Sequence, residues 1–158
     1  MNVDIQLQPG SAAAKVSLVP GETLTAEGGA MIAMSPDMKL TTTTHKKKKG
    51  GIIKALKRMV SGEGFFMNHY ESGANGGDVY LSTALPGDMM TMELQGQGLI
   101  VQGGSYVASS HAIEIDFSWQ GFKSVFSGES IFWLNLNGTG TIIVNSFGAI
   151  YPVEVDGD

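Results

Sequence analysis

The sharpest chemical feature of the sequence is a cluster of basic residues between positions 46 and 58. Seven of the ten lysines and arginines fall in this stretch, which contains no acidic residue. They are Lys46, Lys47, Lys48, Lys49, Lys54, Lys57 and Arg58. Clustered cations bind anionic lipid headgroups and nucleic-acid phosphates, and each one near an anionic membrane contributes about 1 kcal/mol. We therefore take this segment as the candidate anion- or membrane-contacting site.

Part of the segment has the pattern of a helix. Apolar residues recur at the spacing of one helical face and basic residues take the opposite face, which predicts a short basic amphipathic helix over about 51–61. Such a helix can lie on a membrane surface or bind a protein partner. It can also pack on a β body behind a solvated lysine loop. Nucleic acid is less favoured, because no aromatic residue for base stacking occurs between residues 40 and 64.

The acids and histidines do not form a catalytic pattern. Two pairs of acids recur, Glu22 with Asp88 and Glu63 with Glu129, but Pro-Gly-acid and Ser-Gly-Glu are turn sequences. The histidines, which show no His-x-His or His-x-x-x-His spacing, are His45, His69 and His111. Nucleophile-elbow and phosphate-loop motifs are absent from the sequence. We expect a protein that is not an enzyme and that holds no metal or other cofactor.

Composition indicates one folded domain. The chain has 158 residues, 42% of them hydrophobic, and a formal net charge of −5. It contains no cysteine, no apolar run of about 20 residues and no secretory signal, so we expect a cytoplasmic protein that can lie peripherally on a membrane. The acidic total argues against nucleic-acid binding over the whole surface.

Paired glycines separate short β-rich runs, which is typical of an all-β sandwich or barrel. The predicted strands span 3–7, 14–19, 23–27, 30–34, 38–44, 64–71, 78–82, 89–94, 98–102, 105–109, 112–118, 130–136, 140–145 and 149–155. Asn137-Gly138 suits a two-residue turn and predicts a hairpin between the strands that flank it. For the run 149–155 three arrangements are open. It closes the sheet against the first strands, it pairs with another subunit, or the natural chain continues beyond it. An uncapped edge strand favours association, so we expect a homo-oligomer.

The chain also resembles itself. A Pro-Gly-acid turn occurs at 20–22 and 86–88, Gly29–Ser35 is echoed by Gly104–Ser110, and a Ser-Gly-Glu segment occurs at 61–66 and 127–132. The echoes come in the same order, which predicts repeated β units over about 14–82 and 83–146 in a single domain, with a third begun at 147–158.

The order of these motifs resembles a known family. PGE, GGAMIAMS, a Gly-Gly segment with LKRMVSGE, then FF and LSTALPGD follow one another as in bacterial relatives of the mitochondrial biogenesis family called "altered inheritance of mitochondria". The resemblance implies a fold similar to the tryptophan RNA-binding attenuation protein (TRAP), a double-stranded β-helix or barrel-like arrangement of repeats. It implies no established reaction. We therefore expect an oligomeric scaffold or adaptor, with a TRAP-like nucleic-acid or small-ligand binder as the alternative.

Overall fold

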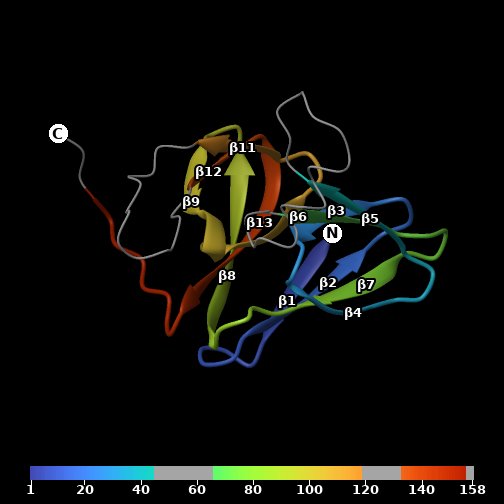
Figure 1. Ribbon diagram of the computed structural model, residues 1–158, viewed down its shortest axis with the longest axis horizontal. Helices are drawn as coiled ribbons and strands as arrows, with labels where there is room; N and C mark the ends of the chain where they lie inside the picture. The colour runs from blue at the N-terminus through green and yellow to red at the C-terminus, as the bar shows by residue number, and fades with distance from the viewer. Residues whose placement is uncertain (45–65, 119–132, 156–158) are drawn as a thin grey trace.

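The computed structural model describes residues 1–44, 66–118 and 133–155, and their main secondary structure is the β-strand (Figure 1). One 3-10 turn, η1 (Gly103–Ser105), interrupts them. The strands are β1 (Asn2–Gln6), β2 (Ala13–Leu18), β3 (Thr23–Glu27), β4 (Met31–Met34), β5 (Lys39–Thr44), β6 (Phe66–Glu71), β7 (Gly77–Leu81), β8 (Gly87–Gln95), β9 (Leu99–Gln102), β10 (Tyr106–Ser110), β11 (Glu114–Ser118), β12 (Trp133–Asn137) and β13 (Thr139–Phe147). The all-β prediction is confirmed. The helix predicted over 51–61 lies outside the described residues.

The strands form three sheets in which named neighbours pair antiparallel. A four-stranded sheet has the order β1-β2-β7-β4, a central six-stranded sheet β5-β6-β3-β10-β13-β8, and a three-stranded sheet β11-β12-β9. Within the described part of the chain these sheets do not close into a barrel. The closer likeness to a double-stranded β-helix or to TRAP stays a prediction.

The central sheet buries both of its faces. Successive side chains on a strand point to opposite sides, so the neighbours Ile142 and Ile143 on β13 enter different cores although both are fully buried. Ile143 belongs to the first core, in which the four-stranded sheet contributes Val16 and Val79. Ile142 belongs to the second core, in which the three-stranded sheet contributes Leu134. The central sheet therefore joins two packed layers.

Strands β2–β7 and β8–β13 follow the same pairing scheme. In the first set the neighbours are β2-β7-β4 and β5-β6-β3, and in the second they are β8-β13-β10 and β11-β12-β9. Each strand of the second set thus takes the place of the strand six positions earlier. We call β2–β7 the first unit and β8–β13 the second unit. The pairing of β3 with β10, which connects them, is called the junction.

The register of the two units also corresponds residue by residue. One constant shift carries Thr25 to Ile100 and Lys39 to Glu114, and a second constant shift carries their partners to the matching partners in β12. Both β4 and β10 also break register at the same point, between Met31 and Ala33 and between Tyr106 and Ala108. Such bulges are specific features of a strand.

The Pro-Gly-acid turns do not fit this correspondence. Residues 20–22 lie between β2 and β3, whereas Gly87 and Asp88 are already the first residues of β8. Gly29–Ser35 and Gly104–Ser110 do occupy equivalent places around β4 and β10. The third pair of echoes, at 61–66 and 127–132, lies outside the described residues except for Phe66.

The predicted Asn137-Gly138 hairpin is wrong. β12 pairs with β11 and β9, whereas β13 pairs with β10 and β8, so the chain changes sheets at Gly138. A type I′ turn needs positive φ at both central residues, and only Gly138, at 125°, has it. A Cβ atom there would lie 2.6 Å from the carbonyl oxygen of Ala112, so glycine serves a close approach.

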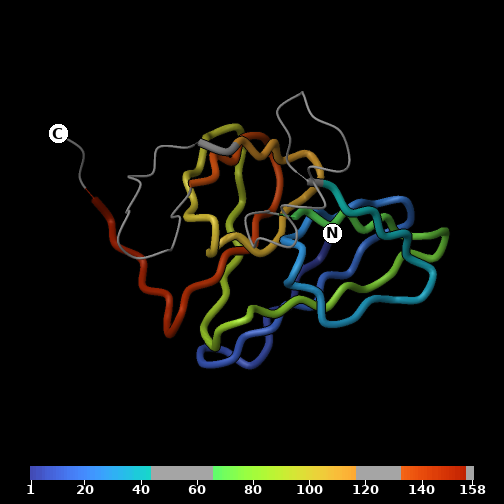
Figure 2. The backbone as a smooth tube through the Cα atoms, viewed as in Figure 1, coloured from blue at the N-terminus to red at the C-terminus, as the bar shows by residue number. Residues whose placement is uncertain are grey.

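The predicted strand over 149–155 is also wrong. Within the described residues this segment joins no sheet, and Tyr151, Val153 and Val155 are exposed. Figure 2 shows it in red, leaving the sheets after β13. Just before this segment, Gly148, which follows β13, forms an isolated parallel bridge with Gly87 at the start of β8. No strand of the described residues therefore covers the apolar side chains of this segment.

Candidate functional site

The seven predicted anion-contacting residues, from Lys46 to Arg58, lie outside the described residues, as does His45. The structure does place the two ends of the segment that carries them. Thr44 pairs with Phe66, and β5 is an outer strand of the central sheet. The basic segment therefore connects two adjacent strands at the margin of that sheet. Within the described residues, no helix is long and apolar enough to cross a membrane.

The acids Glu22 and Asp88 are engaged locally. Glu22 Oε1 accepts a hydrogen bond from the N-terminal ammonium at 2.6 Å, and its Oε2 accepts from the Val19 amide at 3.0 Å. Asp88 Oδ1 accepts from the Gln8 side chain and from the Met89 amide, each at 2.8 Å. Both carboxylates hold turns and termini in place. The second predicted pair, Glu63 and Glu129, lies outside the described residues.

His69 lies beside the junction, and both of its ring nitrogens are within hydrogen-bonding distance of threonine hydroxyl groups. Its Nδ1 lies 3.0 Å from the Thr25 hydroxyl and its Nε2 lies 2.8 Å from the Thr43 hydroxyl. The His111 ring stands edge-on at 6.2 Å between centroids. Burial, and then the charge of nearby His111, lower the pKa of His69, which favours the neutral imidazole. The described residues hold no group of three or more side chains suited to a metal ion.

A buried hydroxyl group forms a hydrogen bond across the junction. The buried Tyr106 on β10 donates its phenol hydrogen to the carbonyl oxygen of Thr25 on β3 at 3.1 Å, and its oxygen lies 2.9 Å from the Ser109 hydroxyl. Burial strongly raises the pKa of Tyr106, so the phenol stays neutral. Thr25 therefore has hydrogen-bond partners on both sides of the junction, Tyr106 at its carbonyl oxygen and His69 at its hydroxyl.

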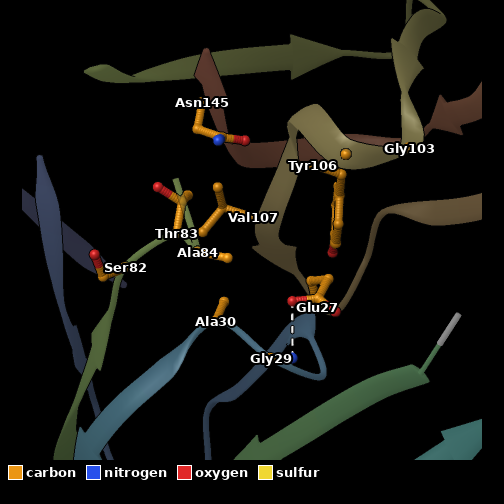
Figure 3. A pocket seen from close by; sticks show the side chains of 11 residues that line it. Glu27, Gly29, Ala30, Ser82, Thr83, Ala84, Gly103, Tyr106, Val107 and Asn145 are labelled. Atoms are coloured by element: carbon orange, nitrogen blue, oxygen red, sulfur yellow. Dashed lines mark hydrogen bonds between the residues drawn. The ribbon is translucent and has the colours of Figure 1, made fainter. Parts of the chain in front are cut away.

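Beside this junction lies a cavity of about 370 Å³ (Figure 3). The end of β3, the loop between β3 and β4, the loop after β7, η1, β10 and β13 all contribute to it. Its lining is mostly of small side chains, namely Glu27, Gly29, Ala30, Ser82, Thr83, Ala84, Gly103, Gly104, Tyr106, Val107 and Asn145. Glu27 Oε2 accepts a hydrogen bond from the Gly29 amide at 2.8 Å. Among these lining residues, Glu27 is the charged one.

The sequence predictions missed this cavity. Its signal was present in the paired glycines Gly28-Gly29 and Gly103-Gly104, which were interpreted only as separators between strands. A Cβ atom at Gly28 would lie 2.8 Å from Cβ of Phe66, and one at Gly29 would lie 3.2 Å from Glu27 Oε2. The first glycine pair therefore allows close contacts where the chain leaves β3, beside the cavity.

These features define a class of protein. In the described residues the chain is an all-β protein of two similarly paired six-strand units, with a small cavity where they meet. The family model described as "Mitochondrial biogenesis AIM24" matches residues 3–158. The chain therefore belongs to the AIM24 mitochondrial biogenesis family, and the resemblance drawn from its motifs is confirmed.

Two similar proteins come from Streptococcus pyogenes. An uncharacterized protein of Streptococcus pyogenes serotype M6, M6_Spy0233, is 27% identical over 148 residues, which cover 90% of this chain but 59% of that protein. The crystal structure of protein SPYM3_0169 from Streptococcus pyogenes superposes with a TM-score of 0.75 at 24% identity. That likeness covers 99% of this chain and 69% of the other. It establishes the fold. This chain spans less than two thirds of the M6 protein's length.

Proposed function

We propose that this protein is a non-enzymatic, self-associating scaffold that binds an anionic membrane surface through its basic segment. The observation that supports this most is the position of that segment. Seven cations are concentrated in 13 residues, and the segment connects the paired ends Thr44 and Phe66 at the margin of the central sheet. A polybasic segment beside a compact β body is suited to hold the body against an anionic surface.

The charge of the remaining chain supports a defined orientation. Outside residues 46–58 the sequence has 3 bases and 15 acids. An anionic membrane repels such an acidic body and attracts the basic segment, because the two signs are separated along the chain. The segment would therefore face the membrane, and the body would face away from it.

The test is co-sedimentation with phosphatidylcholine vesicles, with and without phosphatidylserine, at low and near-physiological salt. We expect binding that requires phosphatidylserine and weakens with salt. Changing Lys46, Lys47, Lys48 and Lys49 to Ala removes about 4 kcal/mol of attraction, or up to about 1,000-fold in affinity. The matched control is the Lys15→Ala, Lys39→Ala double variant, which also loses cations but keeps the segment. Absence of binding at low salt, or equal binding by the quadruple variant, would contradict the proposal.

The junction cavity favours a second candidate function, the binding of a small ligand between the units. Its volume of about 370 Å³ lies within the range of small-molecule pockets. The Glu27 carboxylate on its wall favours a ligand that carries an amine. A thermal-shift panel of free amino acids and simple amines tests this, with Glu27→Gln as the control. A ligand that raises the melting temperature of both forms equally would not be bound at Glu27.

A further inference from the structure

The junction shows which kinds of strand edge fit each other. β10 pairs antiparallel with β3, with Ala108 opposite Ala26, Ser109 opposite Thr25 and Ser110 opposite Leu24. The equivalent strands in the other unit are β4, which corresponds to β10, and β9, which corresponds to β3. Both are outer strands of their sheets. Each unit therefore repeats one half of the junction and leaves it without a neighbouring strand in the described residues.

Exposure follows the same correspondence. Thr25 and Val107 at the junction are 5% and 1% exposed, whereas their equivalents Ile100 and Ile32 are 67% and 59% exposed. Ala108 is fully buried, while its equivalent Ala33 is exposed. Isoleucine in these exposed places, where the junction holds threonine and valine, provides apolar surface that a neighbouring strand would cover.

The other outer strands are protected by charge. Among the described strands, the remaining outer ones are β1, β5, β8 and β11. Each carries at least one charged residue, such as Asp4, Lys39, Asp88 and Glu114. Charged side chains on an edge oppose pairing with another chain. The sequences of β4 (MIAM) and β9 (LIVQ) contain no charge, so these two edges lack that protection.

We propose that β9 of one copy of this chain pairs antiparallel with β4 of a second copy, in the register of the internal junction. The correspondence places Ala33 opposite Val101, Met34 opposite Ile100 and Ser35 opposite Leu99. The proposal rests on the self-association proposed above and identifies the surfaces that perform it. The contact is head-to-tail, because one copy contributes β9 and the next contributes β4. Contacts of this kind, repeated from copy to copy, build rings or filaments.

Disulfide trapping tests the register, because the chain contains no cysteine and every introduced thiol is unique. Residues directly opposite in an antiparallel pair lie within disulfide reach. A Met34→Cys variant mixed with an Ile100→Cys variant is expected to give a covalent dimer under mild oxidation. Two matched controls are expected to give only background: Ile100→Cys alone, and Leu40→Cys on the β5 edge mixed with Ile100→Cys.

Measuring the oligomeric mass in solution distinguishes a wrong interface from a protein that does not self-associate. Light scattering across a concentration series should show association of the wild type, at least tenfold weaker for Ile100→Lys and unchanged for Leu85→Lys, an equally exposed leucine position in a loop. Circular dichroism confirms that both variants fold. A wild type that stays monomeric at all concentrations overturns the scaffold and this interface together. An oligomer that gives no specific disulfide and tolerates Ile100→Lys overturns the interface alone.

Discussion

The middle strands β6 and β12 occupy equivalent places in the two units but are held by different chemistry. In β6, Asn68 accepts a hydrogen bond from the Thr42 hydroxyl at 2.7 Å and donates to the Tyr70 phenol oxygen at 3.1 Å and the Gly28 carbonyl at 3.2 Å. Leu134 and Leu136 take the places of Asn68 and Tyr70 in β12, and both are fully buried.

The comparison shows that the pairing scheme does not depend on one kind of interior. A buried amide is tolerated in the first unit because its donors and its acceptor all have partners, and no described buried polar side-chain atom lacks one. The second unit reaches the same arrangement with aliphatic packing. A satisfied polar network fixes one arrangement of side chains, whereas leucines contribute stability through burial.

Shortening a buried leucine of the second unit is expected to lower the free energy of unfolding most. Leu134→Ala removes a fully buried side chain from the second core and leaves a cavity, which should lower the free energy of unfolding by about 2–5 kcal/mol. Urea unfolding followed by circular dichroism measures this. Leu85→Ala, at an exposed leucine, should change it by less than about 0.5 kcal/mol. Equal losses in the two variants would show that the second core is not packed as described.

Replacing Asn68 by leucine, the residue at the equivalent position of the second unit, tests what the polar network contributes to stability. Asn68→Leu leaves the Thr42 and Tyr70 hydroxyls and the Gly28 carbonyl without their partner, so we expect a loss of about 1–3 kcal/mol in the same assay. The triple variant Thr42→Val, Asn68→Leu, Tyr70→Phe removes both hydroxyls as well and should recover part of that loss. A neutral single variant would show that the network does not stabilise the fold.

The smallest expected effect is the pH dependence of stability that comes from His69, whose equivalent in β12 is Asn135. Because the pKa of folded His69 lies below that of the unfolded chain, about 6.5, the unfolded state binds the proton first. The contribution of neutral His69 to stability is therefore full above pH 6.5 and is lost as pH falls below it. Unfolding curves at pH 7.5 and 5.5 should show this decline in the wild type and a weaker one in His69→Asn. Identical pH dependence would assign the decline to other groups.

Local patterns predicted most strands of the fold. Thirteen of the runs expected from β-rich segments and glycine punctuation overlap the observed strands. In β11, one of these strands, Ile115 is half-buried between exposed Glu114 and Asp116, as expected of a strand with one covered face. The Asn137-Gly138 hairpin and the 149–155 strand were wrong, because whether two runs pair is decided by partners far away in the sequence. A turn motif reports local φ preference and cannot report which sheet receives the next strand.

The candidate sites were harder to predict, for the same reason. The charge cluster at Lys46–Lys49 is visible in composition alone. The junction cavity needs Glu27, Ser82 and Asn145 to come together from separate strands and loops, and no spacing reveals that. The open edges of β4 and β9 likewise appear only once the strand order is known, although the echo between Gly29–Ser35 and Gly104–Ser110 already related one edge to half of the junction.

The pairing scheme also has a consequence for how this chain folds. In each unit the first strand pairs with the last, β2 with β7 and β8 with β13, so neither sheet arrangement is complete until its sixth strand is available. Pairings between distant segments close long loops and slow folding relative to local hairpins. On the ribosome, the first unit must wait for Leu81 and the second for β13. Until then the uncharged strands β4 and β9 remain in the growing chain with fewer neighbours than in the finished molecule, which makes synthesis the period of greatest risk for aggregation.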